Sequence, residues 1–110
     1  MSDNKNVKHI SDQEFDSVIG TGVSLVDFWA PWCGPCRSQG PILDRVATAM
    51  DGSVKICKIN VDENQETARR FNISAIPSIM IFKDGKKVKS FVGLQQESVL
   101  VSALQSYLAN

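Results

Sequence analysis

A strand, a helix and a second strand follow one another in the first half of the chain. Residues 23–29 are apolar apart from Ser24 and Asp27, which is typical of a strand buried on both faces. Apolar residues then recur at helical spacing over residues 36–50, and residues 54–61 have the pattern of another strand. Two strands joined by a helix lie parallel in one sheet, with a right-handed crossover. The sequence therefore predicts an α/β fold.

The remaining segments predict shorter elements around this unit. These are a strand, two helices, a hairpin and a terminal helix, at residues 7–10, 11–19, 64–71, 78–92 and 95–108. Ser11 and Glu14 have the pattern of a capping box, and Asp84-Gly85 is typical of a hairpin turn. The last helix should turn six side chains toward the core: Val99, Leu100, Ala103, Leu104, Tyr107 and Leu108. We expect a mixed central sheet of about five strands with helices on both faces.

Length and charge limit the class of protein. The 110 residues suffice for a single domain, residues 1–110, with a flexible tail at 1–6. Twelve basic and twelve acidic residues cancel, so nothing favours nucleic acid or a membrane as a partner. The polar N-terminus lacks a signal-peptide pattern, and no apolar run approaches the roughly 18 residues of a membrane span. These absences favour the cytoplasm, and we expect a monomer because no large apolar face is left over.

Cys33 and Cys36 stand two residues apart where the first strand of this unit gives way to the helix. In a reducing cytoplasm such a pair is typical of redox chemistry or metal binding rather than of a structural disulfide. A zinc half-site is one alternative, but zinc takes about four ligands, and only Cys57 and His9 could add to this pair. Two inert thiols are the other alternative. We expect Cys57 to be a small buried hydrophobe.

The two thiols should differ in reactivity if the helix begins beside Cys33. The free amides and the dipole of a helix N-terminus lower the pKa of a thiol placed there. Cys36 lies one turn further in and should be less exposed. Cys33 is then the nucleophile that forms a mixed disulfide with a substrate, and Cys36 is the resolving thiol. Gly34 and Pro35 add no positive charge beside the thiolate, which favours a reducing pair.

The segment Trp29–Cys36, Trp-Ala-Pro-Trp-Cys-Gly-Pro-Cys, resembles the active site of the thioredoxins. The resemblance extends from about Val7 to Leu108. It implies a thioredoxin fold and a protein-disulfide reductase that carries no bound cofactor. Its electrons would come from NADPH through a flavoprotein thioredoxin reductase. The implied partners are that reductase and disulfide-containing protein substrates.

The resemblance also implies roles for two charged residues. The matching aspartate of the thioredoxins is buried beneath the active site, so Asp27 would act as a base that takes the proton from Cys36. Burial would raise its pKa toward the working range of such a base. Lys58 matches a lysine near that aspartate, and its ammonium group would lower the same pKa. For both residues the alternative is a solvent-facing position in a strand.

A substrate-binding rim is implied around the cysteine pair. Pro77 matches a proline that follows a cis bond in the thioredoxins, and this bond leaves the backbone of Ile76 free to pair with an extended substrate. Trp32, Val92 and Gly93 would complete the rim. The alternatives are an ordinary loop proline and scattered surface apolar residues.

The turn after the motif, Arg37-Ser38-Gln39-Gly40, departs from the thioredoxin pattern of a lysine followed by mostly apolar residues. Arg37 keeps the charge, while the other three residues make the turn more polar. Gly40 should weaken the helix by up to about 1 kcal/mol relative to alanine. Because the turn borders the active site, we expect it to affect the choice of partner, including the reductase.

Two other functions remain as alternatives. Related disulfide oxidants and isomerases carry a histidine between the cysteines, and this chain has none there. A binding or accessory subunit would use the same fold with an idle redox site. The presence of both cysteines and of Asp27 argues against that as the sole role.

Overall fold

The computed structural model describes residues 6–109. Its elements are, in chain order, β1 (Val7–His9), α1 (Phe15–Ile19), β2 (Val23–Trp29), α2 (Gly34–Met50), β3 (Lys55–Asn60), α3 (Gln65–Arg70), β4 (Ser78–Lys83), β5 (Lys86–Val92) and α4 (Glu97–Leu108). The tail expected at residues 1–6 lies outside the described residues, apart from Asn6. No helix within residues 6–109 is long and apolar enough to cross a membrane.

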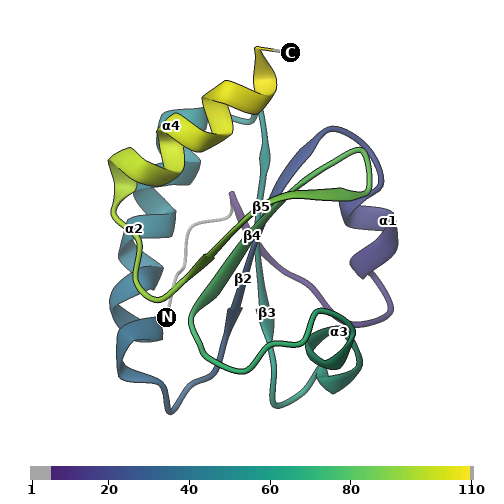
Figure 1. Cartoon of the computed structure of the whole chain (residues 1–110). Coiled ribbons are helices and arrows are strands. Elements are labelled where there is room, and N and C mark those ends of the chain that lie inside the picture. Colours follow the sequence, from purple (N-terminus) through teal and green to yellow (C-terminus); the bar gives the residue numbers. More distant parts are fainter. Residues whose placement is uncertain (1–5, 110) are drawn as a thin grey trace.

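The five strands form one mixed sheet in the order β1-β3-β2-β4-β5. Strand β3 pairs in parallel with both β1 and β2, whereas β4 pairs antiparallel with β2 and β5. Helices α2 and α4 cover one face of the sheet, and α1 and α3 lie on the other (Figure 1). The predicted α/β architecture, a five-stranded mixed sheet with helices on both faces, is confirmed.

Strand β2 lies at the centre of the sheet, and all seven of its residues are buried. Alternate side chains of a strand point to opposite faces, which divides the core in two. Leu25 packs in the cluster that contains Leu43 and Leu100, from α2 and α4. Val26 packs in the other cluster, which contains Phe15 of α1. Held on both faces, β2 carries the chain rigidly to the cysteine motif at its C-terminal end.

Helix α2 begins beside Cys33, as expected from the predicted difference in reactivity between the two thiols. Cys33 is its N-cap residue, and Pro35 lies in the first turn, where a missing N–H group breaks no helical hydrogen bond. The helix continues through Pro41 to Met50. It ends at Asp51, whose φ of 46° is left-handed.

Two local expectations were wrong. Only half of the capping box forms: the backbone N and the Oγ of Ser11 both donate to Glu14 Oε1, at 3.1 Å each. The Ser11 hydroxyl caps no amide of the helix: α1 begins only at Phe15, its N-cap residue is Glu14, and it has no side-chain capping bond.

The second correction concerns the core-facing stripe of α4. Leu100 and Leu104 are fully buried, but Val99 and Leu108 are 43% and 42% exposed. One side of α4 packs over α2 and the sheet, and the two buried leucines lie four residues apart along that side. Ala103 and Tyr107 are partly buried and pack against the core as predicted, so the correction concerns only Val99 and Leu108.

Candidate active site

The Cys33–Cys36 pair forms a disulfide at the N-terminus of α2, with 5.2 Å between the two Cα atoms. The Cys33 sulfur accepts a hydrogen bond from the backbone N of Cys36, at 3.2 Å. A capping side chain makes this kind of bond to the free amides of a helix. The same amide and the helix dipole are placed to stabilise a negative charge on this sulfur once the disulfide is reduced. Cys36 is the less exposed of the two, at 1% against 5%, as expected.

The segment before β4 lies directly against Cys33. The Cys33 sulfur is 3.7 Å from the carbonyl oxygen of Ile76. The Ile76–Pro77 peptide bond is cis, which confirms the expectation. Gly93 donates from its backbone N to the carbonyl of Pro77 at 2.8 Å, which joins the end of β5 to this segment. Gly93 has a φ of +88°, a left-handed conformation that favours glycine.

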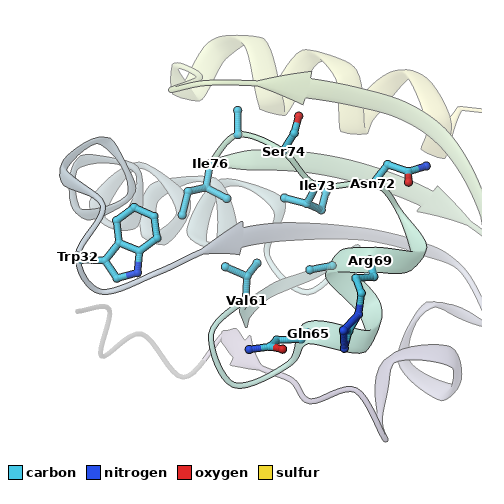
Figure 2. Close-up of a pocket in the computed structure, with 10 residues that line it drawn as sticks. Trp32, Val61, Gln65, Arg69, Asn72, Ile73, Ser74 and Ile76 are labelled. Carbon is cyan, nitrogen blue, oxygen red and sulfur yellow. The ribbon is translucent and has the colours of Figure 1, made fainter.

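Trp32 and Ile76 border a groove of about 720 Å³ beside the cysteine pair. Figure 2 shows these two side chains at one end of the groove, with Ile73 and Arg69 further along it. Trp32 is 68% exposed, and the Nε1 of its ring donates to Asp62 at 2.9 Å. That bond holds a large exposed ring in one orientation at the mouth of the groove.

Val92 and Gly93 do not belong to the lining of this groove. They lie at the end of β5, where Val92 pairs with Ser78 and is 69% exposed. The sequence-predicted rim residues are therefore divided by the segment of Ile76 and Pro77. Trp32 lies toward α3, and Val92 and Gly93 lie toward the start of α4.

Asp27 is fully buried in β2, next to Lys58 in the paired strand β3. Neither carboxylate oxygen has a hydrogen-bond partner among the described residues. Burial raises the pKa of Asp27 to about 7, although the charge of Lys58 opposes this shift. Burial also lowers the pKa of Lys58, against the opposing charges of Asp27 and Asp44. A carboxyl group with a pKa near 7 can take up and release protons at neutral pH.

A cavity of about 180 Å³ connects Cys36 with Lys58. Cys36, Gly40, Asp44 and Lys58 contribute to its lining, together with Trp29. The Nζ of Lys58 lies 4.3 Å from the centroid of the Trp29 ring. The cavity is polar on one side and large enough to hold water. Lys58 and Cys36 thus face the same cavity, while Asp27 does not contribute to its lining.

The polar turn differs from expectation. Arg37 and Ser38 are exposed, but Gln39 and Gly40 are buried, so only half of the turn changes the surface. The Gln39 Nε2 donates to the carbonyl of Gln95 at 3.0 Å, and its Oε1 accepts from the backbone N of the same residue at 2.8 Å. Gln39 thus joins α2 to the loop between β5 and α4.

Sequence reasoning missed this contact, and it also missed the bond between Trp32 and Asp62. The second could have been found from topology. Trp32 and Asp62 each come shortly after one of two parallel strands, and such strands end at the same edge of a sheet. Gln39 gave no comparable signal, because its partner is a backbone group distant in the sequence.

Comparison with known proteins gives the family. The family model named Thioredoxin matches residues 6–106. The chain belongs to the thioredoxin family. Thioredoxins from Staphylococcus epidermidis and Staphylococcus aureus are 44% and 42% identical to this chain over 99 residues, which is 90% of this chain and 95% of theirs.

Solved thioredoxin structures agree with this fold. A mutant thioredoxin from Halobacterium salinarum superposes with a TM-score of 0.86 at 33% identity, covering 98% of this chain and 96% of its own. A thioredoxin from Malassezia sympodialis gives a TM-score of 0.84 at 35% identity, covering 93% and 90%. The predicted thioredoxin fold is confirmed.

This thioredoxin is a protein-disulfide oxidoreductase whose redox-active centre is the Cys33–Cys36 pair. It is of the thioredoxin disulfide-reductase type, which works by dithiol–disulfide exchange and normally needs no bound cofactor. Within residues 6–109, no three histidine, cysteine, aspartate or glutamate side chains come together in a way that could hold a metal ion.

Proposed function

We propose that Cys33 is the nucleophile and Cys36 the resolving thiol in the reduction of protein disulfides. The observation that carries this assignment is the Cys33 sulfur at the helix N-cap, 3.2 Å from the amide of Cys36. The Cys33 thiolate attacks one substrate sulfur, and the other sulfur leaves as a thiolate. Cys36 then attacks the Cys33 sulfur and expels the second substrate thiolate. Two electrons pass to the substrate, and the Cys33–Cys36 disulfide remains.

Asp27 serves in this proposal as the base for Cys36. Its pKa of about 7 keeps a fraction of the carboxyl groups ionised at neutral pH, ready to accept the Cys36 proton by way of water. Lys58 holds that pKa below the value that burial alone would produce. Cys36 shares a cavity with Lys58, the neighbour of Asp27 in the paired strand, whereas Asp27 itself does not line this cavity.

The substrate lies in an extended conformation across the cysteine pair. The backbone of Ile76 is available to pair with it next to Cys33, and Pro77 fixes the path of this segment. Trp32 on one side, and Val92 and Gly93 on the other, form the apolar rim. Neither Gly34 nor Pro35 adds a positive charge beside the thiolate, which favours a reducing pair.

Membership of the thioredoxin family supports the remaining parts of the proposal: the location of the protein, its electron source and its substrates. The chain acts as a monomeric single-domain carrier in the cytoplasm. It is recharged with electrons from NADPH through a flavoprotein thioredoxin reductase. Its substrates are proteins that carry a reducible disulfide, and neither nucleic acid nor a membrane is needed.

A trapping experiment tests the order of the two thiols. The Cys36→Ser protein should accumulate a mixed disulfide with insulin, because the second attack is blocked. The Cys33→Ser protein should accumulate none. Mass spectrometry of the non-reduced mixtures measures both. Trapping by the Cys33→Ser protein alone would reverse the assignment.

Rapid kinetics test the role of Asp27. The Asp27→Asn variant should release substrate from the mixed disulfide more slowly near neutral pH, while the first attack by Cys33 changes less. Asp51→Asn is the matched control, since Asp51 is exposed at the other end of α2. Equal rates for Asp27→Asn and the parent across pH 6 to 9 would remove Asp27 from the mechanism.

Equilibration with dithiothreitol buffers tests the direction of the reaction. A reduction potential below about −250 mV would mark a reductant matched to the cytoplasm. A value above about −200 mV would mark an oxidant or isomerase instead. The absence of any two-electron transition would favour a binding role for the fold.

A further inference from the structure

Gln39 is a fully buried polar side chain that the thiol chemistry does not use. Its amide group pairs with both backbone groups of one residue: it donates to the Gln95 carbonyl at 3.0 Å and accepts from the Gln95 amide at 2.8 Å. Both polar ends of the side chain are therefore satisfied by the same partner. A two-point contact of this kind fixes the position and the orientation of the peptide that it holds.

This contact lies between the catalytic helix and the substrate rim. Gln39 comes three residues after Cys36, so both side chains lie on the same side of α2. Gln95 comes two residues after Gly93 and directs its own Nε2 to the carbonyls of Val92 and Gly93, at 3.3 Å each. Gln39 is thus linked to both rim residues on the β5 side through a single intermediate residue.

The segment of residues 92–95 is held at three places, the first of which is the pairing of Val92 with Ser78 of β4. Near Cys33, the amide of Gly93 donates to the carbonyl of Pro77 at 2.8 Å. Further on, Gln39 holds Gln95 to α2. A glycine with positive φ and an exposed valine do not fix such a segment by packing. The hydrogen bonds are what keep it in place beside the cysteine pair.

We propose that Gln39 is a positioning residue for protein substrates of this thioredoxin. Together with the pairing of Val92 to Ser78 and the bond of Gly93 to Pro77, it keeps Val92 and Gly93 at a fixed place relative to Cys33, so that an extended polypeptide meets a preformed rim. Gln39 contacts neither sulfur and acts through Gln95. This inference rests on the proposed function, and it assigns one residue of the polar turn, Gln39, to substrate binding rather than to the outer surface.

The proposal predicts that loss of the Gln39 contact weakens the binding of protein disulfides but does not affect small disulfides. A polypeptide needs the rim on both sides of Cys33, whereas a small disulfide needs only the Cys33 sulfur. Freeing residues 92–95 lets the rim take several positions, and a substrate must then select one of them, which weakens binding. The attack by Cys33 itself keeps its rate.

The Gln39→Met variant tests this, because methionine has a similar size and can make neither hydrogen bond. Gln96→Met is the matched control, since Gln96 is exposed next to Gln95 and makes no capping bond. Oxidation of the reduced protein is followed by tryptophan fluorescence, with insulin as the protein disulfide and hydroxyethyl disulfide as the small one. Exchange of the Gln95 amide proton, followed by NMR, reports on the contact itself.

In Gln39→Met we expect faster exchange of the Gln95 amide and a half-saturating insulin concentration raised about fivefold, the effect of one ordinary hydrogen bond. The maximal rate and the rate with hydroxyethyl disulfide should match the parent and Gln96→Met. Faster exchange with unchanged insulin binding would overturn the proposal and leave Gln39 a structural role. An equal loss with hydroxyethyl disulfide would overturn it too, by placing the effect on the thiols.

Gln39→Glu provides a second variant in case the first folds poorly. A protonated glutamate can donate to the Gln95 carbonyl and accept from its amide, whereas an ionised one can only accept. Relative to the parent at each pH, insulin binding should be near normal at pH 5 and weakened at pH 8. The same ratio at both pH values would contradict the proposal. A parent protein that reduces neither disulfide would instead refute the proposed function.

Discussion

At the scale of single residues, Asp27 links the site to the stability of the fold. Its pKa of about 7 in the folded protein compares with 3.8 for an ordinary aspartate. Between about pH 4 and pH 7, the folded protein keeps a proton that the unfolded chain has lost. The free energy of unfolding therefore falls as the pH rises through this range. The folded protein is less stable with Asp27 ionised than with Asp27 protonated.

The Asp27→Asn variant should lose this pH dependence, because asparagine does not titrate. We expect the decrease in the free energy of unfolding between pH 5 and pH 8 to be smaller by roughly 2–3 kcal/mol than in the parent. Urea unfolding at both pH values measures it, and comparing pH values within one variant cancels the cost of burying the amide. The same decrease in both proteins would mean that Asp27 titrates as an exposed aspartate does.

How much of the site could be predicted differs from residue to residue. The cysteines were found from their spacing and their place before a helix, and the cis bond at Pro77 from the family resemblance. Both signals are local in the sequence. The contact of Gln39 with Gln95 joins positions 56 residues apart, and the sequence of the turn that contains Gln39 suggested only a more polar surface. A polar residue inside a helix is buried or exposed according to what packs against it, which sequence periodicity does not fix.

At the scale of the elements, α3 takes its N-terminal cap from a distant segment. Its own N-cap residue, Asn64, makes no side-chain capping bond. Instead, the Asp12 carboxylate accepts from the backbone N of Glu66 at 3.3 Å and of Thr67 at 2.9 Å. Burial acts to raise the pKa of Asp12, but these hydrogen bonds outweigh it and the net shift is downward. The carboxylate therefore anchors α3, which flanks the groove of Figure 2.

The Asp12→Ala variant should be less stable by about 1 kcal/mol, the usual effect of losing an N-cap. A carboxylate with a lowered pKa stabilises the fold above the unfolded value near pH 4, and this is lost as the pH falls through the folded pKa. Urea unfolding at pH 7 should show the difference, and unfolding below pH 3 should show less of it. Gln13→Ala, an exposed neighbour, is the control. A deficit that persists unchanged in acid would point to lost packing instead.

Gly40 weakens α2 at a place where a methyl group would fit. An added Cβ would lie 3.8 Å from the Nζ of Lys58, an ordinary contact distance. We expect Gly40→Ala to raise the free energy of unfolding by about 0.5–1 kcal/mol, because alanine loses less backbone freedom in a helix. Gly22→Ala is the opposite control: its φ of +69° disfavours alanine, so stability should fall. Thermal unfolding of both variants measures the two signs.

Most element positions could be predicted because hydrophobic periodicity and turn residues are local signals. Strand β2 was placed from its apolar run, and the left-handed residues Asp84 and Gly85 form the expected hairpin turn. The capping box and the outer edge of α4 were wrong for a different reason. Ser11 does meet its predicted partner Glu14, but as a donor, and the exposure of Val99 depends on which side of α4 packs against the rest of the molecule.

At the scale of the whole molecule, the redox state of the cysteine pair is thermodynamically coupled to the stability of the fold. A dithiol is strongly reducing when the folded protein favours its disulfide form, since the fold then stabilises the product of the reaction. The features of this site agree with that direction. The thiolate has no cation beside it within the Cys-Gly-Pro-Cys motif, and the Asp27 carboxylate is buried nearby without a hydrogen-bond partner among the described residues.

The oxidised protein should therefore resist urea better than the reduced protein. The midpoint of unfolding, followed by far-ultraviolet circular dichroism with and without dithiothreitol, measures the difference. A protein with both Cys33→Ser and Cys36→Ser is the control, because its midpoint should not depend on dithiothreitol. A more stable reduced form is the property of a strong disulfide oxidant. That result would contradict the reducing direction proposed here, while leaving the family and the fold unchanged.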